Sequence, residues 1–238
     1  MAINMGQLPF VNLPLEIRLE IYSHLFVRPI FNIYQKPSSL GLCATDTREN
    51  FAGAQKAVIY GAAMYTALSL ACKQLQAEVS SFLYSHNTFR FRHPKVLSAF
   101  LVQIGQNNAR YIRTLHIVIP WNQEGWIFWP SELLCKLSSD AGNIRNIEIT
   151  FETIPRSGLH TYVFGSYDNI LSMVIGRRQS LEFNLQLAFR RLPALETIVI
   201  WGDCSEGWLE CLEKCTGCKA RLNKTVGTLD GMFQPDNK

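Results

Sequence analysis

The sequence predicts an α/β fold in which a small helical module precedes an irregular array of parallel strands and helices. Residues 13–26 and 66–84 carry apolar side chains at spacings of three and four, as amphipathic helices do. The stretches 112–119, 144–151 and 195–202 share the pattern Leu/Ile-x-x-Leu/Ile-x-Ile, and helix-like segments separate them. Such alternation predicts parallel strands with right-handed crossovers. Recurrence of one unit favours a solenoid-like arc, and an ordinary α/β domain with three similar strands is the alternative.

Composition limits the classes of function. The 238 residues are 47% hydrophobic, and 23 basic against 19 acidic residues give a net charge of +4. This charge is small and dispersed, so we expect neither a nucleic-acid nor a membrane partner. No apolar run is long enough to span a membrane, and the N-terminus has no secretory signal pattern. With seven cysteines, an odd number, we expect a reduced compartment, the cytoplasm or the nucleus.

The first expected helix has apolar residues on more than one face. Asn12 is a candidate N-cap, and Pro14 suits the first helical turn. At 100° per residue the apolar positions form two stripes, with Arg18 between them. One stripe contains Ile17, Ile21 and Leu25, and the other contains Leu15, Leu19, Tyr22 and Phe26. Either both stripes are buried within the chain, or one of them packs on a second protein as in helix-in-groove recognition.

The rest of the N-terminal region reads as strand, loop, helix and strand. Residues 29–34 are strand-like, and residues 35–64 are rich in Gly, Pro and Ser and read as a loop. The helix expected over 66–84 follows, and the alternating TFRF at 88–91 reads as a strand.

The two helical blocks resemble the F-box-like region of many filamentous-fungal proteins. The similarity lies in LPLEIRLEIYSHLF (13–26) and LSLACKQLQAEVSSFLYSHNTFRF (68–91). It implies that residues 8–93 form a small helical module, here with a loop insertion at about 35–64. It also implies docking on a Skp-type adaptor of a cullin–RING ubiquitin ligase. The matching residues to which the resemblance assigns this docking are Leu13, Pro14, Ile17, Ile21 and Leu25.

Residues 94–218 are expected to form the strand–helix array, which resembles the leucine-rich repeats that often follow an F-box. Its helices are expected at 94–109, about 130–142, about 168–191 and around 206–215. Alternate strand residues should face those helices and form the core. These core residues are Leu115, Ile117, Ile119, Ile147, Ile149, Phe151, Ile198 and Ile200. Residues 219–238 show little periodicity, so we expect a poorly ordered tail and an array of three or four units.

The opposite strand face is the candidate surface for an unidentified protein target. If the arc is open, this mixed face is exposed to solvent, and a tryptophan among polar residues suits recognition. Its candidate residues are His116, Val118, Glu148, Thr150, Val199 and Trp201. Trp126 and Trp129, with Trp121 and Phe128, follow the first of the repeated strands. These aromatic side chains either cover the edge of the core or anchor a partner.

Evidence for chemistry in the sequence is weak. Cys204, Cys211, Cys215 and Cys218 supply four thiols, but only the last two have the C-x2-C spacing of zinc sites. His116 and Glu148 occupy the same repeat position, as a cross-strand pair or an acid/base pair. No nucleophile motif or phosphate-binding loop accompanies them. We therefore expect a non-catalytic interaction protein without cofactors: a ubiquitin-ligase substrate receptor, or an interaction protein in which the helices only cap the repeats. A zinc-binding or enzymatic protein that uses the C-terminal cysteines is the less favoured alternative.

Overall fold

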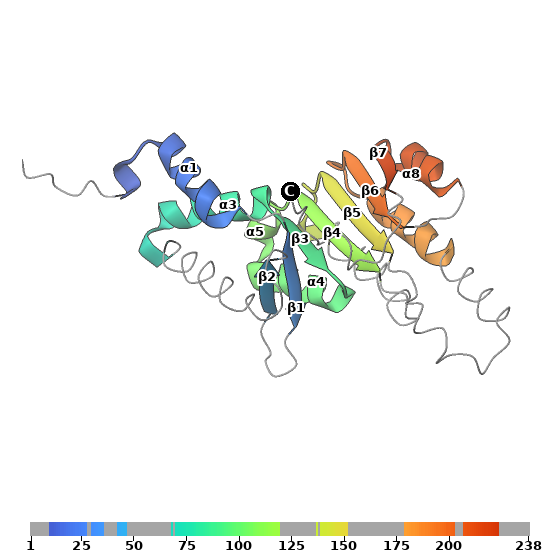
Figure 1. The fold of residues 1–238 in the computed structure, drawn as a ribbon, viewed down its shortest axis with the longest axis horizontal. Coiled ribbons are helices and arrows are strands. Elements are labelled where there is room, and N and C mark those ends of the chain that lie inside the picture. The colour runs from blue at the N-terminus through green and yellow to red at the C-terminus, as the bar shows by residue number, and fades with distance from the viewer. Residues whose placement is uncertain are drawn as a thin grey trace, which may run out of the picture.

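In the part of the chain that the structure describes, one seven-stranded sheet has helices between its strands (Figure 1). The computed structural model describes residues 10–27, 30–35, 42–46, 68, 70–119, 137, 139–151, 179–202 and 207–223. The strands in chain order are β1 (Phe31–Gln35), β2 (Leu42–Asp46), β3 (Thr88–Phe91), β4 (Thr114–Ile119), β5 (Asn146–Phe151), β6 (Thr197–Trp201) and β7 (Lys219–Asn223). Their order across the sheet is β2-β1-β3-β4-β5-β6-β7.

Strand pairing confirms the predicted parallel array. The six strands β1, β3, β4, β5, β6 and β7 pair in parallel with their neighbours. The edge strand β2 pairs antiparallel with β1. From β3 to β7, strands that follow one another along the chain lie side by side, as in a leucine-rich-repeat-like arc. The repeated stretches keep their alignment, since Leu115 pairs with Ile147 and Ile147 with Ile198.

The array is longer than expected. β1 and β3 come from the N-terminal region, so the boundary expected near residue 93 does not separate two sheets. β2 lies within the expected loop insertion at 35–64. The expected poorly ordered tail is wrong for Lys219–Asn223, which form β7 and pair with β6. Residues 224–238 lie outside the described residues.

The helices follow the predicted alternation, with two interruptions. Their bounds are α1 (Leu15–Phe26), α3 (Lys73–His86), α4 (Pro94–Ile104), α5 (Gln106–Ala109) and α8 (Trp208–Thr216), and residues 179–189 are also helical. The helix expected over 66–84 is broken at Cys72, which has extended backbone and caps α3: the Leu75 N–H donates to its Sγ at 3.5 Å. The helix expected over 94–109 is split at Gly105, whose φ of +75° suits glycine.

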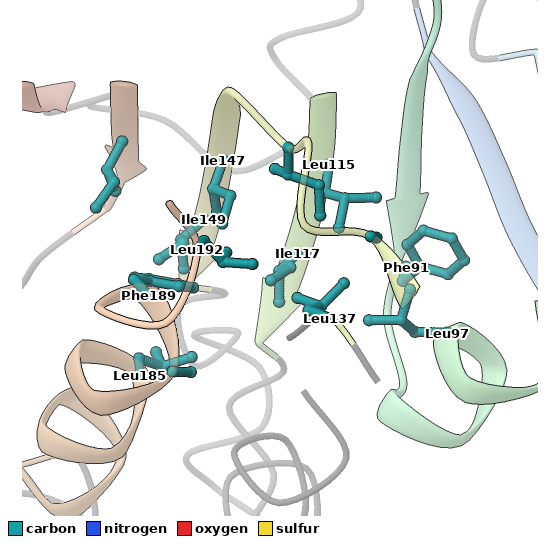
Figure 2. Close-up of a cluster of buried hydrophobic side chains, with 14 of the residues drawn as sticks. Phe91, Leu97, Leu115, Ile117, Leu137, Ile147, Ile149, Leu185, Phe189 and Leu192 are labelled. Atoms are coloured by element: carbon teal, nitrogen blue, oxygen red, sulfur yellow. The ribbon is translucent and has the colours of Figure 1, made fainter. Parts of the chain in front are cut away.

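The main core lies between the sheet and the helices on one of its faces. All eight predicted core residues are at least nine-tenths buried, from Leu115 on β4 to Ile200 on β6. The cluster drawn in Figure 2 combines strand residues such as Ile117 and Ile149 with Leu97 of α4 and with Leu185 and Phe189 of the helix at 179–189. Burial of these aliphatic and aromatic side chains is the dominant stabilising contribution to the fold.

A second, smaller core joins α1 to α3. It contains Tyr22, Phe26, Val79 and Phe82, and the Tyr22 and Phe82 ring centroids lie 5.8 Å apart. The partly buried Leu83 packs against both clusters, and the adjacent Tyr84 belongs to the main core. α3 therefore connects α1 to the sheet. Within the described part of the chain, no helix has the length and apolarity needed to cross a membrane.

Candidate protein-interaction sites

The inward side of α1 consists of Arg18, Tyr22 and Phe26, which follow one another at four-residue spacing. Tyr22 is fully buried, and Arg18 and Phe26 are almost so. The Phe10 ring, from the 3₁₀ turn Phe10–Asn12 before α1, lies 6.0 Å from the Tyr22 ring. A charged residue thus lies on the buried arc between the two apolar stripes, which raises the question of how its charge is compensated.

The Arg18 charge is compensated by Glu78 of α3. Arg18 Nε donates to Glu78 Oε2 at 2.9 Å, and Arg18 Nη2 donates to Glu78 Oε1 at 2.7 Å. This fork-to-fork geometry is the strongest form of an arginine–carboxylate pair. The Tyr22 hydroxyl donates to Glu78 Oε2 at 3.2 Å, and Gln74 Nε2 donates to Oε1 at 3.0 Å. Glu78 therefore accepts from α1 and from its own helix.

The ionisation of these groups reflects their proximity. Hydrogen bonding from Arg18 lowers the pKa of the Glu78 carboxyl, with burial opposing it. Hydrogen bonding to Glu78 raises the pKa of the Arg18 guanidinium. Burial, together with the nearby Glu78 charge, raises the pKa of the Tyr22 hydroxyl to about 12. At neutral pH the pair is ionised and Tyr22 is a neutral donor.

The outward side of α1 exposes apolar side chains from both predicted stripes. Ile17 is 50% exposed and Leu19 is 37% exposed, so the alternative in which the chain buries both stripes is wrong at these positions. Among the other residues that the resemblance assigns to docking, Pro14 is exposed, and Leu13 and Ile21 are partly exposed. Leu25 packs against the α1–α3 core.

On the sheet, strand register brings the predicted target-face residues into rows. His116 pairs with Glu148, and Glu148 pairs with Val199. Val118 pairs with Thr150, and Thr150 pairs with Trp201. The six residues therefore form two adjacent rows across β4, β5 and β6. Arg90 of β3 was not among the residues predicted from the sequence. It pairs with His116 and extends the first row with a positive charge. Its signal was the TFRF alternation, which places Arg90 on the face away from the core.

The polar contacts within these rows cross the strands. His116 Nε2 lies 2.8 Å from Thr150 Oγ1, and His116 Nδ1 lies 3.9 Å from Glu148 Oε2, beyond hydrogen-bond distance. Burial, with the charge of Arg90 second, lowers the pKa of His116 to about 3, so the ring is neutral at neutral pH. Burial raises the pKa of Glu148. The predicted proximity of His116 and Glu148 is confirmed.

The expectation that this strand face is open to solvent is wrong for half of the predicted residues. Val118 is fully buried, and His116 and Thr150 are more than nine-tenths buried. Glu148, Val199 and Trp201 are partly exposed. Both faces of β4 are therefore covered, as is usual for a parallel strand. Trp126 and Trp129, with Trp121 and Phe128, lie outside the described residues, and the target-binding role stays a prediction.

The C-terminal cysteines have separate surroundings. Cys211 is exposed on α8, and the half-buried Cys215 accepts a hydrogen bond from Gln186 Nε2 at 2.8 Å. The buried Cys218 lies 2.6 Å from Thr216 Oγ1. Among the residues that the structure describes, no three His, Cys, Asp or Glu side chains are grouped as metal ligands, and Cys204 is not one of those residues.

Comparison with known proteins identifies a family without assigning an activity. Residues 4–141 match the family described as Domain of unknown function (DUF7730), which covers more than half of the chain, so the chain belongs to this family. No curated protein and no solved structure matches.

Proposed function

For this member of the DUF7730 family, we propose a non-catalytic role as a substrate-recognition subunit of a Skp–cullin–F-box type ubiquitin ligase. α1 and the turn before it dock a Skp-type adaptor through Leu13, Pro14, Ile17 and Ile21. Leu25 supports that surface from the internal core. The strand face, through the exposed parts of Glu148, Val199 and Trp201, contributes to holding the protein target.

The observation that carries this proposal is the half-exposed Ile17 on a helix that is otherwise firmly held. Tyr22 and the Arg18–Glu78 pair fix the inner side of α1 against α3. Ile17 is nevertheless 50% exposed, with the exposed Pro14 and the partly exposed Ile21 on the neighbouring turns. An apolar stripe on a rigid helix is suited to helix-in-groove recognition because docking requires little ordering of the helix. The resemblance of residues 13–26 and 68–91 to an F-box-like region supports a Skp-type adaptor as its occupant.

Co-purification of the full chain with a Skp-type adaptor tests the proposal. The test variant is Ile17→Asp/Ile21→Asp, and the matched control is Leu15→Asp/Leu19→Asp, which places the same charges on the other stripe. We expect the control and the unaltered chain to retain the adaptor and the test variant to lose it. Retention by a folded test variant would refute the assignment of this stripe, as would loss in both variants to the same extent.

The second candidate function is a structural cap, and the position of α3 favours it. Leu83 packs on both cores, and the Tyr84 ring lies 5.8 Å from Phe89 of the sheet. Terminal units of repeat arrays need such covers. If α1 and α3 serve only as a cap, the full chain is well folded and forms no complex with the adaptor.

A further inference from the structure

Arg18, on α1, contacts two further parts of the chain with one guanidinium group. Its Nε and Nη2 are occupied by Glu78, as described above. Its remaining nitrogen, Nη1, donates to the backbone carbonyl of Val11 at 3.0 Å and also to the carbonyl of Leu13. Arg18 therefore joins α3, α1 and the segment Phe10–Pro14, which we call the leading turn.

The leading turn contains two of the residues proposed to dock the adaptor. The Leu13 backbone N–H donates to Phe10 O at 3.2 Å within the turn. The backbone N–H of Arg18 donates to Pro14 O at 3.1 Å. The path of the turn therefore determines where Leu13 and Pro14 lie relative to Ile17, which is one helical turn further on. Within the turn, the carbonyls of Val11 and Leu13 both accept hydrogen bonds from the Arg18 side chain.

We propose that Arg18 is a positioning residue for the adaptor-docking surface: by holding the carbonyls of Val11 and Leu13, it presents Leu13 and Pro14 beside Ile17. This inference rests on the proposed function. The role requires an arginine, because the planar fork satisfies a carboxylate on one edge while another N–H group reaches the backbone. A lysine at this position supplies the charge without that geometry.

Exchanging the charges of Arg18 and Glu78 distinguishes positioning of the leading turn from a role in which Arg18 only joins α1 to α3. The variant Arg18→Glu removes both sets of contacts. The double variant Arg18→Glu/Glu78→Arg places a cation opposite an anion again, but it leaves the carbonyls of Val11 and Leu13 without their donor. The readouts are the melting temperature, hydrogen exchange of the Leu13 amide and the affinity for a Skp-type adaptor. Arg18→Lys is the third and conservative variant, chosen to keep the fold.

We expect the double variant to regain melting temperature relative to Arg18→Glu without regaining slow exchange at Leu13. In Arg18→Lys and in the double variant we expect adaptor affinity about tenfold weaker than in the unaltered chain, with Leu13 exchange faster by a similar factor. If the double variant regains affinity and slow exchange together with melting temperature, or if Arg18→Lys matches the unaltered chain, the proposal is overturned.

The exchange measurement keeps this proposal distinct from the proposed function. If the unaltered chain binds no adaptor, the docking function fails and the positioning of a docking surface fails with it. Exchange at Leu13 then still decides whether Arg18 holds the leading turn. Exchange that is unchanged in every Arg18 variant overturns that assignment, whatever the adaptor does.

Discussion

Glu78 and Arg18 lie 60 residues apart in the sequence and form a two-pronged ion pair, with nitrogen–oxygen distances of 2.9 and 2.7 Å. The pair joins the two sequence blocks that resemble an F-box. It forms the polar centre of the interface between α1 and α3, which otherwise consists of aromatic and aliphatic side chains. A buried arginine without its carboxylate partner is strongly destabilising, so the two residues act as a unit.

Removing the Tyr22 hydroxyl tests the third member of this network. Tyr22→Phe leaves the packed ring in place and removes one hydrogen bond to Glu78. We expect the free energy of unfolding to fall by about 1 kcal/mol, measured by urea denaturation. Glu78→Ala should cost more, because it leaves the Arg18 charge without a partner. If Tyr22→Phe costs more than Glu78→Ala, the carboxylate is not the centre of the network.

The buried His116 predicts a loss of stability in acid. Its folded pKa of about 3 lies below the ordinary value of 6.5, so below pH 6.5 the unfolded chain binds the proton first. The unfolded state is therefore favoured as pH falls from about 6.5 to about 3, by at most about 1.4 kcal/mol per pH unit. The raised pKa of Glu148 acts in the opposite sense, and Arg90 stays charged throughout.

The measurement is the free energy of unfolding between pH 6.5 and pH 4.5. The control is His116→Gln, which cannot be protonated. We expect the unaltered chain to lose stability more steeply than the variant over this range. Parallel curves would show that His116 is not kept neutral by burial.

On the strand face away from the main core, truncation of a valine should cost more unfolding free energy at Val118 than at Val199. Val118→Ala removes two carbons from a fully buried site and should cost about 2 kcal/mol of unfolding free energy. Val199→Ala makes the same change at a partly exposed site on β6 and should cost about half of that or less. Equal small costs in urea denaturation would mean that the face over β4 is open.

Just after β6, the backbone at Gly202 leaves no room for a side chain. Its φ is +97°, and a Cβ there would lie 2.9 Å from the carbonyl oxygen of Phe151. Gly202→Ala should therefore cost roughly 1–3 kcal/mol. Gly217→Ala, at the C-cap of α8 with φ +73° and open space around it, should cost only the conformational share, about 1 kcal/mol. Thermal unfolding of both variants checks the difference, and equal costs would exclude the steric explanation.

The strand pattern alone was enough to predict the residues that the strands β4, β5 and β6 contribute to the core. The recurring Leu/Ile-x-x-Leu/Ile-x-Ile pattern placed residues such as Ile117 and Ile149 on the inner face, and period-2 alternation is a reliable signal in strands. β7 was missed because KARLN alternates exposed basic residues with only Ala220 and Leu222, as an edge strand can. The break at Cys72 was missed because a cysteine is not among the usual N-cap residues.

The contacts that organise the candidate site depend on tertiary structure. The helical wheel placed Arg18 between two apolar stripes but contained no sign of its partner, since Glu78 lies on another helix. Burial of Val118 and His116 also requires chain from elsewhere to cover the sheet, which strand periodicity cannot indicate. Proximity of His116 to Glu148 was predictable because equal positions in parallel repeats fall in register.

Docking of an adaptor on α1 is tested most directly by isothermal titration calorimetry of the full chain with a Skp-type adaptor, alongside Ile17→Asp and Leu19→Asp. We expect a one-to-one complex whose dissociation constant rises at least about tenfold in Ile17→Asp and changes little in Leu19→Asp. A folded chain that gives no binding heat and no complex by size-exclusion chromatography, or variants that bind with equal affinity, would contradict it.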